Sequence, residues 1–524
     1  MEYPDSLKTV LTYDDPLGPI DADKIPPDLT YYIYSGHSVL TRILKRNPKY
    51  IYGRRGSGKT SYLQLASSRG HYQYTIPLEL NELLTSLHGL DYPDVMYVEN
   101  VAHFWNDLIY LIACKYYSTL EGSDSYVRDF VAKFESNIPN GIISRYSNSS
   151  VPINGILWNI IDILKDSQGN ALLATIPKLI YKYTGISLSE CKQRLFNHLR
   201  TTNKSIAVLI DSIDEYNYGD FISDRLLGGL FKFIGRHHNN PLFITLALPL
   251  EHKSIHDNVS TNPTKDFSQC QTIEWRTTEL LSIVATRLYL FLRLYYKDHR
   301  FAIQDDVSTL YTREGAVRFL NNILPTEITN FNGYLENTIG YILRHTHLLP
   351  RHVLLLLNAI FSNAIYSTAD LTLHSINGEL IKSSISKIEP ILAKEIMRAF
   401  RPIYKNVYDA LGRVLPQLGP AFTIGELHRQ FNQGAKAVCD LQTVPDVHEF
   451  LKMLLSMGVV GVVTNPDHVT KYILAEFYYT LPDIEDKGRQ NEVFVLHPLF
   501  SSLFSRRQGK PVYPSALSYT IENR

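Results

Sequence analysis

The sequence has no excess of charge of either sign. Its 524 residues carry 52 lysines and arginines and 52 aspartates and glutamates. This balance excludes a global attraction to nucleic acid or acidic membranes, although it permits a local basic patch. No apolar run approaches the roughly 18 residues of a membrane span. The segment after Met1 lacks the basic and apolar regions of a signal peptide. We therefore expect a cytoplasmic protein with no membrane partner.

Cysteine is also scarce. The four cysteines lie far apart and form no CxxC or Cys/His pattern, which argues against zinc and fits a reducing cytosol. The remaining composition, 44% hydrophobic and 20% charged, is that of an ordinary globular protein. A chain of this length is too long for one core, so we expect two to four domains. The cysteines are Cys114, Cys191, Cys270 and Cys439.

The most informative motif is glycine-rich. Residues 53–60 match the nucleotide-phosphate pattern G-x-x-x-x-G-K-[ST]. A β-prone run at 49–52 precedes the motif, and a helix start follows it at 60–66. Strand, loop and helix in that order predict a phosphate-binding loop. The predicted nucleotide-binding residues here are Gly53, Arg54, Arg55, Gly56, Ser57, Gly58, Lys59, Thr60 and Ser61.

Each part of this loop has a physical role. Glycines let backbone N–H groups crowd a phosphate, and the positive end of the following helix faces the same anion. We expect Lys59 to reach the β- and γ-phosphates and Thr60 to place its hydroxyl on Mg²⁺. Arg54 and Arg55 could hold phosphates or face solvent, and solvent is the favoured interpretation.

A second motif follows at 205–215. The apolar run 205–210 ends in Asp211, which is typical of a buried parallel strand whose carboxyl end lies beside the phosphates. Asp211 is the candidate Mg²⁺ contact. Asp214 or Glu215 would orient and deprotonate the attacking water, with Glu215 favoured. On its own, the run would be better explained as a buried strand ending in an acidic turn.

Further strands are expected at 72–78, 241–249 and 271–275. Thr245, in the middle one, could sense the γ-phosphate, but a hydrogen-bonded core threonine is favoured. A helix is expected to begin at Pro350. Arg351 lies in its first turn, where a cation opposes the helix dipole, which suggests a role such as reaching a phosphate from a lid. An ion pair is the alternative. Other helices are expected at 37–46, 98–117, 156–164, 188–199, 278–296, 314–324, 334–346 and 378–394.

The pattern changes after residue 403. Three helices, at 407–418, 422–431 and 445–457, precede β-prone runs at 459–463 and 494–496, and this order predicts a winged helix with a two-stranded hairpin. Its third helix carries one lysine, Lys452, beside Asp446 and Glu449. Helices that read the major groove normally present Arg, Asn, Gln or Lys. The sequence thus favours protein docking over sequence-specific DNA binding.

Together, the motifs at 53–60 and 207–215, the lid and the winged helix resemble P-loop ATPases of the STAND and Orc/Cdc6-like branch of the AAA+ superclass. The resemblance implies ATP and Mg²⁺ as cofactors and a sensor-2 role for Arg351. Residues 494–500 resemble the end of winged-helix domains in uncharacterised bacterial ATPases. One departure is that the interval 251–271, where an arginine finger is expected, has Lys253 and Lys265 but no arginine. Hydrolysis of ATP between subunits is therefore in doubt.

We predict an α/β P-loop NTPase core with a parallel sheet, a helical insertion, a helical lid and a C-terminal winged helix, mostly α overall. The expected domains are 1–276, with the insertion at about 80–200, then 277–385 and 386–524. The predicted function is a Mg²⁺-dependent ATPase switch or motor acting with a separately encoded effector or sensor, with anti-phage defence as the role that the resemblance suggests. The alternatives are a DNA-binding initiator- or loader-like ATPase and a nucleotide-responsive scaffold. A homo-oligomer is compatible with each.

Overall fold

In the computed structural model, the chain divides into two compact units. The core unit comprises residues 43–52 and 59–272, and the C-terminal unit comprises residues 1–42, 53–58 and 273–524. No helix among the described residues is both long enough and apolar enough to cross a membrane. The described residues are 3–34, 38–68, 71–79, 84, 97–136, 180–182, 184–211, 220–296, 307–368, 371, 373, 376–440, 442–465, 471–478, 492–504 and 509–518.

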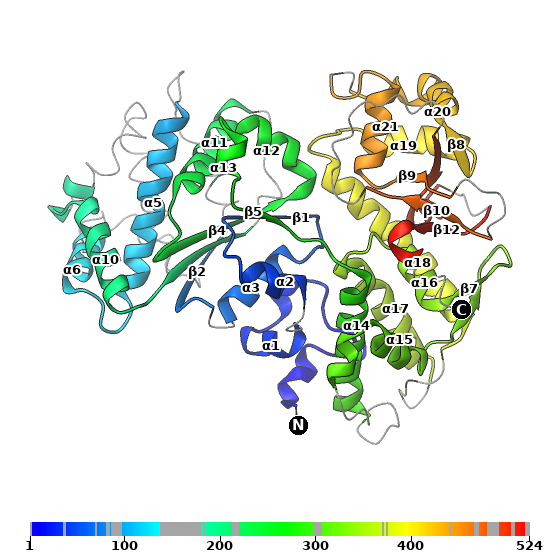
Figure 1. Cartoon of the computed structure of the whole chain (residues 1–524), viewed down its shortest axis with the longest axis horizontal. Helices are drawn as coiled ribbons and strands as arrows, with labels where there is room; N and C mark the ends of the chain where they lie inside the picture. The colour runs from blue at the N-terminus through cyan, green and yellow to red at the C-terminus, as the bar shows by residue number, and fades with distance from the viewer. Residues whose placement is uncertain are drawn as a thin grey trace. The chain divides into compact units, whose positions relative to one another are not determined.

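A five-stranded sheet organises the core unit (Figure 1). The strand order is β2-β3-β4-β1-β5, and the pairs β2–β3, β3–β4 and β1–β5 are parallel. This arrangement confirms the predicted α/β core with a parallel sheet. The strands are β1 (Tyr50–Gly53), β2 (Tyr74–Glu79), β3 (Ile206–Asp211), β4 (Leu242–Pro249) and β5 (Cys270–Thr272).

Helices cover both faces of this sheet. Ile206, Val208 and Ile210 alternate along β3 and join the hydrophobic cluster formed with α5 (Val98–Ser118) and α11 (Phe221–Arg236). On the opposite face, α3 (Lys59–Ser68) contacts β2, β3 and β4. The continuous apolar run in β3 is buried because helices lie against both of its faces.

The insertion between β2 and β3 is helical where it is described. It contains α5, α6 (Ser125–Ser136) and α10 (Leu188–Thr201). The helix predicted at 156–164 lies outside the described residues. After β4, the core unit continues through α12 (Lys253–Val259) and α13 (Pro263–Asp266) to β5.

The C-terminal unit is mainly helical. The short helices α1 (Thr30–Ile33) and α2 (Val39–Leu44) precede β1, and the predicted helix beginning at Pro350 is present as α17. The α-helices that follow β5 are α14 (Thr277–Tyr295), α15 (Arg313–Asn321), α16 (Thr338–Arg344), α17 (Pro350–Tyr366), α18 (Gly378–Phe400), α19 (Val407–Val414), α20 (Ile424–Gln430) and α21 (Val447–Ser456).

Two sequence predictions in this unit were wrong, and a third was incomplete. The segment 334–346 begins as a strand, which pairs antiparallel with residues 327–329 before α16 starts. Residues 421–423 form a strand before α20. The runs 459–463 and 494–496 pair antiparallel, as predicted, but they belong to a five-stranded sheet in the order β12-β10-β9-β11-β8 and do not form a two-stranded hairpin. These strands are β6 (Glu327–Thr329), β7 (Leu335–Asn337), β8 (Ala421–Thr423), β9 (Val460–Val463), β10 (Ile473–Glu476), β11 (Val493–Leu496) and β12 (Val512–Pro514).

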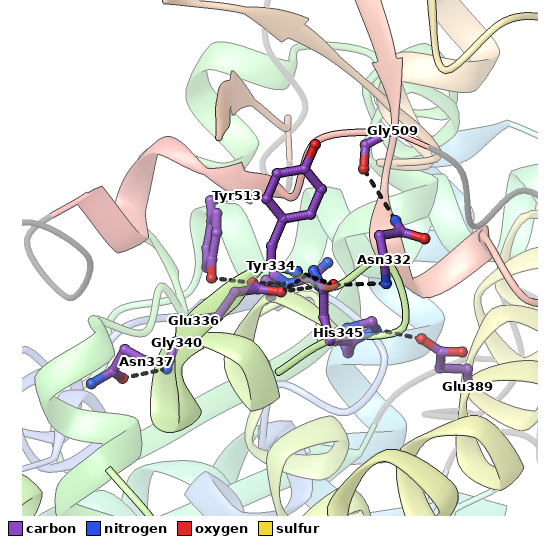
Figure 2. A network of polar contacts seen from close by, with 11 residues as sticks. Asn332, Tyr334, Glu336, Asn337, Gly340, His345, Glu389, Gly509 and Tyr513 are labelled. Atoms are coloured by element: carbon purple, nitrogen blue, oxygen red, sulfur yellow. Dashed lines mark hydrogen bonds and ion pairs between the residues drawn. The ribbon is translucent and has the colours of Figure 1, made fainter. Parts of the chain in front are cut away.

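A buried carboxylate ties the β6–β7 hairpin to α16 and β12. Glu336 accepts two hydrogen bonds from Arg344, at 2.9 and 3.0 Å, one from Asn330 at 2.6 Å, and one from the hydroxyl of Tyr513 (Figure 2). Burial raises the pKa of Tyr513, which keeps its hydroxyl protonated as a donor. The charge of Glu336 is therefore matched by Arg344, and each of its oxygens accepts two hydrogen bonds.

The N-terminal segment is fastened to α17 by one buried amide. Asn358 accepts a hydrogen bond from the backbone N–H of Leu17 at 2.7 Å and donates one to the carbonyl of Gly18 at 2.9 Å. Arg287 of α14 also donates to the carbonyl of Leu17. These bonds fix the backbone shortly before Asp21, a residue that belongs to the candidate site.

Candidate nucleotide site

The core unit brings together two of the predicted site residues. β3 ends at Asp211, and α3 begins at Lys59. The hydroxyl of Thr60 donates a hydrogen bond to Oδ2 of Asp211 at 2.9 Å. A hydroxyl and a carboxylate are the oxygen ligands that Mg²⁺ prefers, so this pair fits a divalent cation. Lys59 lies in the same first helical turn, and only 6% of it is exposed.

The backbone of the loop has the conformation that an anion site requires. Gly56 and Gly58 have φ angles of +81° and +95°, in the left-handed region that glycine tolerates. Such residues turn successive N–H groups toward one side and form a concave anion site. The backbone N–H of Ser57 donates to the carbonyl of Arg54, while the buried Oγ of Ser57 has no hydrogen-bond partner in the described part of the chain. The loop therefore fits a phosphate group.

The two arginines of the loop have different surroundings, and solvent exposure was the wrong interpretation for Arg54. Its side chain is 5% exposed, and Nη2 donates to the carbonyl of Met457 at 3.4 Å. Met457 caps the C-terminal end of α21, where the helix dipole favours a cation. Arg55 is exposed, as expected, and its Nε lies 3.9 Å from Glu395 on α18.

Arg351 lies against the loop but is held by carboxylates. Its backbone N–H donates to the carbonyl of Gly56 at 3.4 Å, and a Cβ atom built on Gly56 would lie 2.9 Å from the Cβ of Arg351. The guanidinium pairs with Glu395 at 2.7 Å and with Asp21. Burial raises the pKa of Asp21, but the hydrogen bond from Lys24 and the charge of Arg351 outweigh it and lower this pKa. The ion pair considered from the sequence is therefore present.

Three contacts to this site have no signal in the sequence. Trp275 donates from Nε1 to the carbonyl of Ser57 at 2.7 Å, which fixes one peptide of the loop. Asp21 and Glu395 reach Arg351 from segments that are 330 and 44 residues away. Trp275 is the last residue of the strand predicted at 271–275, but the observed strand, β5, ends at Thr272.

The remaining predicted residues divide into two groups. Asp214 and Glu215 lie outside the described residues, so their roles remain predictions. Thr245 is 1% exposed and donates to the carbonyl of Pro48 at 2.8 Å, which confirms the favoured interpretation as a hydrogen-bonded core threonine.

Comparisons with known proteins give only distant similarity. No family model and no curated protein matches the sequence. The structure is similar to the ORC2 protein of Aeropyrum pernix in ADPNP–ADP complexes, with 12% identity, a TM-score of 0.37, and coverage of 93% of this chain and 96% of that chain. It is also similar to the Aeropyrum pernix ORC1 protein in complex with DNA, with 13% identity, a TM-score of 0.32, and coverage of 85% and 88%. For a Walker-type ATPase of Pyrococcus abyssi, the identity is 10%, the TM-score 0.39, and the coverage 94% and 99%.

Proposed function

We propose that this chain binds and hydrolyses ATP with Mg²⁺. The observation that carries the proposal is the contact between Thr60, in the first turn after the phosphate loop, and Asp211, at the carboxyl end of a buried parallel strand. A structural turn would need neither the left-handed glycines nor an acid at that strand end. The preference for ATP over other triphosphates rests on the family resemblance.

Each residue of the proposed site has a defined task. Backbone N–H groups of the loop and the positive end of α3 hold the phosphates, and Lys59 balances their charge. Thr60 and Asp211 would hold Mg²⁺, which when bound supplies positive charge to the phosphate oxygens. Glu215 would orient the attacking water and accept its proton, with Asp214 as the alternative.

We further propose a regulatory switch that acts with a separate effector, with residues 277–385 as a lid and 386–524 as a winged-helix module. Protein docking suits this module better than DNA reading, because the only lysine on α21, Lys452, pairs with Glu449 at 3.3 Å. A role in anti-phage defence follows from the resemblance alone. DNA binding and a scaffold with little turnover remain the alternatives.

The decisive experiment combines turnover and ligand-induced stability. We expect Mg²⁺-dependent ATP hydrolysis by the wild type, and loss of both hydrolysis and ATP-induced stabilisation in Lys59→Ala. Lys45→Ala, at an exposed lysine, is the matched control. ATP at about 100 times its Kd should stabilise the wild type by roughly 2.7 kcal/mol.

Two further variants identify the general base. Glu215→Gln should bind ATP but not hydrolyse it, whereas Asp214→Asn should retain turnover. The opposite result would assign the base to Asp214. A wild type that neither hydrolyses ATP nor gains stability from it would refute the proposed function, and stabilisation without turnover would support the scaffold. Turnover that DNA increases would favour the DNA-binding alternative.

A further inference from the structure

The core unit has a groove away from the predicted phosphate loop. Its volume is about 540 Å³, and it is lined by residues of α5, the end of α10 and the segment that joins α11 to β4. Arg200 lies in the last turn of α10, just before β3, and His238 lies just before β4. The groove is therefore at the amino ends of these strands. Asp211 lies at the carboxyl end of β3, so the groove is at the opposite edge of the sheet.

Cations outnumber carboxylates in the groove. The lining includes Arg200 and Arg236, and its one carboxylate is Glu99. Glu99 is already engaged, because it pairs with Lys232 at 2.6 Å and with Arg236, and the hydrogen bonds from these two residues lower its pKa to about 2. Arg200 is exposed, and no ion pair among the described residues involves it. Its charge is available to an anionic ligand.

Aromatic rings lie beside these cations. The ring centroids of Tyr110 and Phe196 are 5.5 Å apart, and the guanidinium of Arg200 lies 5.8 Å from the centre of the Phe196 ring. Phe196 is partly exposed, so part of its side chain is open to a ligand beside Arg200. Aromatic side chains interleaved with cations are the usual means of holding bases and phosphates together.

Hydrogen-bonding groups complete the lining. Nε2 of His237 lies 2.8 Å from the carbonyl of Leu242, which can only accept, so this nitrogen carries a proton. Burial lowers the pKa of His237 to about 4, which leaves the ring neutral with Nδ1 as an acceptor. The side-chain amides of Asn106 and Asn240 also line the groove. Nδ2 of Asn106 donates one hydrogen bond to Asp107 at 2.9 Å, which leaves its second N–H and its oxygen as further hydrogen-bonding groups. Such groups match the edge of a nucleobase better than a simple anion.

We propose that this groove binds a phosphorylated nucleoside, either as a free nucleotide or as one unit of a single strand. Arg200 would contact the phosphate, Phe196 the base, and the amides and His237 the base edge. Pockets of roughly 300–1,000 Å³ hold ligands of this size, whereas a duplex would not enter with its bases paired. The site is separate from the proposed ATPase centre and does not depend on it.

The test separates this groove from the phosphate loop. Fluorescence anisotropy would measure the binding of labelled ADP and a labelled 12-nucleotide single strand to the Lys59→Ala chain, with the matching duplex and tripolyphosphate as competitors. We expect binding to persist in Lys59→Ala and to weaken at least tenfold when Arg200→Gln is added. Arg194→Gln is the matched control, because Arg194 is an exposed arginine on the same helix, outside the groove lining.

Each outcome decides the proposal. Tighter binding of the 12-nucleotide strand than of ADP identifies the single strand as the ligand, and the reverse identifies the free nucleotide. The slope of log affinity against log salt concentration for the 12-nucleotide strand should become smaller by about one in Arg200→Gln. Equal binding by the Arg200→Gln and Arg194→Gln chains, no binding in Lys59→Ala, preference for the duplex, or equal competition by tripolyphosphate would overturn the proposal. The ATPase activity of the wild type tests the proposed function separately, and its result does not decide whether the groove binds a nucleotide.

Discussion

The hydroxyl of Thr60 and the carboxylate of Asp211 lie 2.9 Å apart and join the first turn of α3 to the end of β3. If they hold Mg²⁺ together, Thr60→Val should raise the Mg²⁺ concentration for half-maximal turnover by roughly 10- to 100-fold, as losses in a metal's ligand shell commonly do. Thr60→Ser keeps the oxygen and should stay near the wild-type value. A Mg²⁺ titration of ATPase activity measures both. An unchanged midpoint in Thr60→Val would remove the hydroxyl from the metal site.

The two ion pairs of Arg351, with Asp21 and Glu395, predict an effect on nucleotide affinity. Asp21 and Glu395 neutralise this arginine and place two carboxylates beside it, within the unit that contains Gly56. Asp21→Asn should tighten ATP binding several-fold, because it removes a negative charge that opposes phosphates and frees one side of the guanidinium. Asp28→Asn, at an exposed acid of the same segment, is the control. Equal Kd values for ATP in the two variants, measured by calorimetry, would show that the Asp21–Arg351 ion pair does not lower ATP affinity.

The Glu336–Arg344 pair predicts a large stability effect. Glu336→Gln leaves the buried charge of Arg344 uncompensated, which should lower the free energy of unfolding of the C-terminal unit by about 3–5 kcal/mol. The exposed Glu314→Gln should change it by less than about 0.5 kcal/mol. Urea unfolding compares the two variants. The double variant Glu336→Leu/Arg344→Met should recover much of the loss, because it buries no charge.

Buried histidine predicts acid sensitivity of the core unit. The pKa of His237 is about 4 when folded, whereas an unfolded histidine has a value of about 6.5. The unfolded state therefore binds more protons between these values, so stability falls as the pH drops below about 6.5 and levels off below about 4. His237 alone should lower the free energy of unfolding by about 2 kcal/mol at pH 5 relative to pH 8.

Unfolding by denaturant at several pH values measures the slope of the free energy of unfolding against pH. His237→Gln should flatten it, and His238→Gln, at the exposed neighbour, controls for histidine removal. A slope that His237→Gln leaves intact would show that other groups cause the acid sensitivity.

Three elements near the candidate site were predictable because their signals are local. The strand before the loop, the apolar run that ends in Asp211, and the helix that begins at Pro350 each carry their pattern within a few residues. The strands β6 and β7 have three residues each, and each buries one side chain. Strands this short do not show a recognisable alternation of apolar and polar residues in the sequence. β10 and β12 pair across about 40 intervening positions, which no local pattern encodes.

The direction of side chains was less predictable than the elements that carry them. Thr60 and Asp211 meet because the carboxyl ends of parallel strands share one edge of a sheet. Arg54 turns to the carbonyl of Met457, 403 residues away in sequence, so composition around the loop could not identify its partner. The same applies to Asp21 and Arg351.

The hydrogen bond from Trp275 to the carbonyl of Ser57 gives the loop a built-in optical probe. The chain has only three tryptophans, Trp105, Trp158 and Trp275. With the other two tryptophans replaced by phenylalanine, all tryptophan fluorescence would come from Trp275, whose ring is hydrogen-bonded to the loop backbone. A spectral shift on mixing could then time the arrival and departure of a ligand in stopped-flow experiments, without a dye or a modified nucleotide.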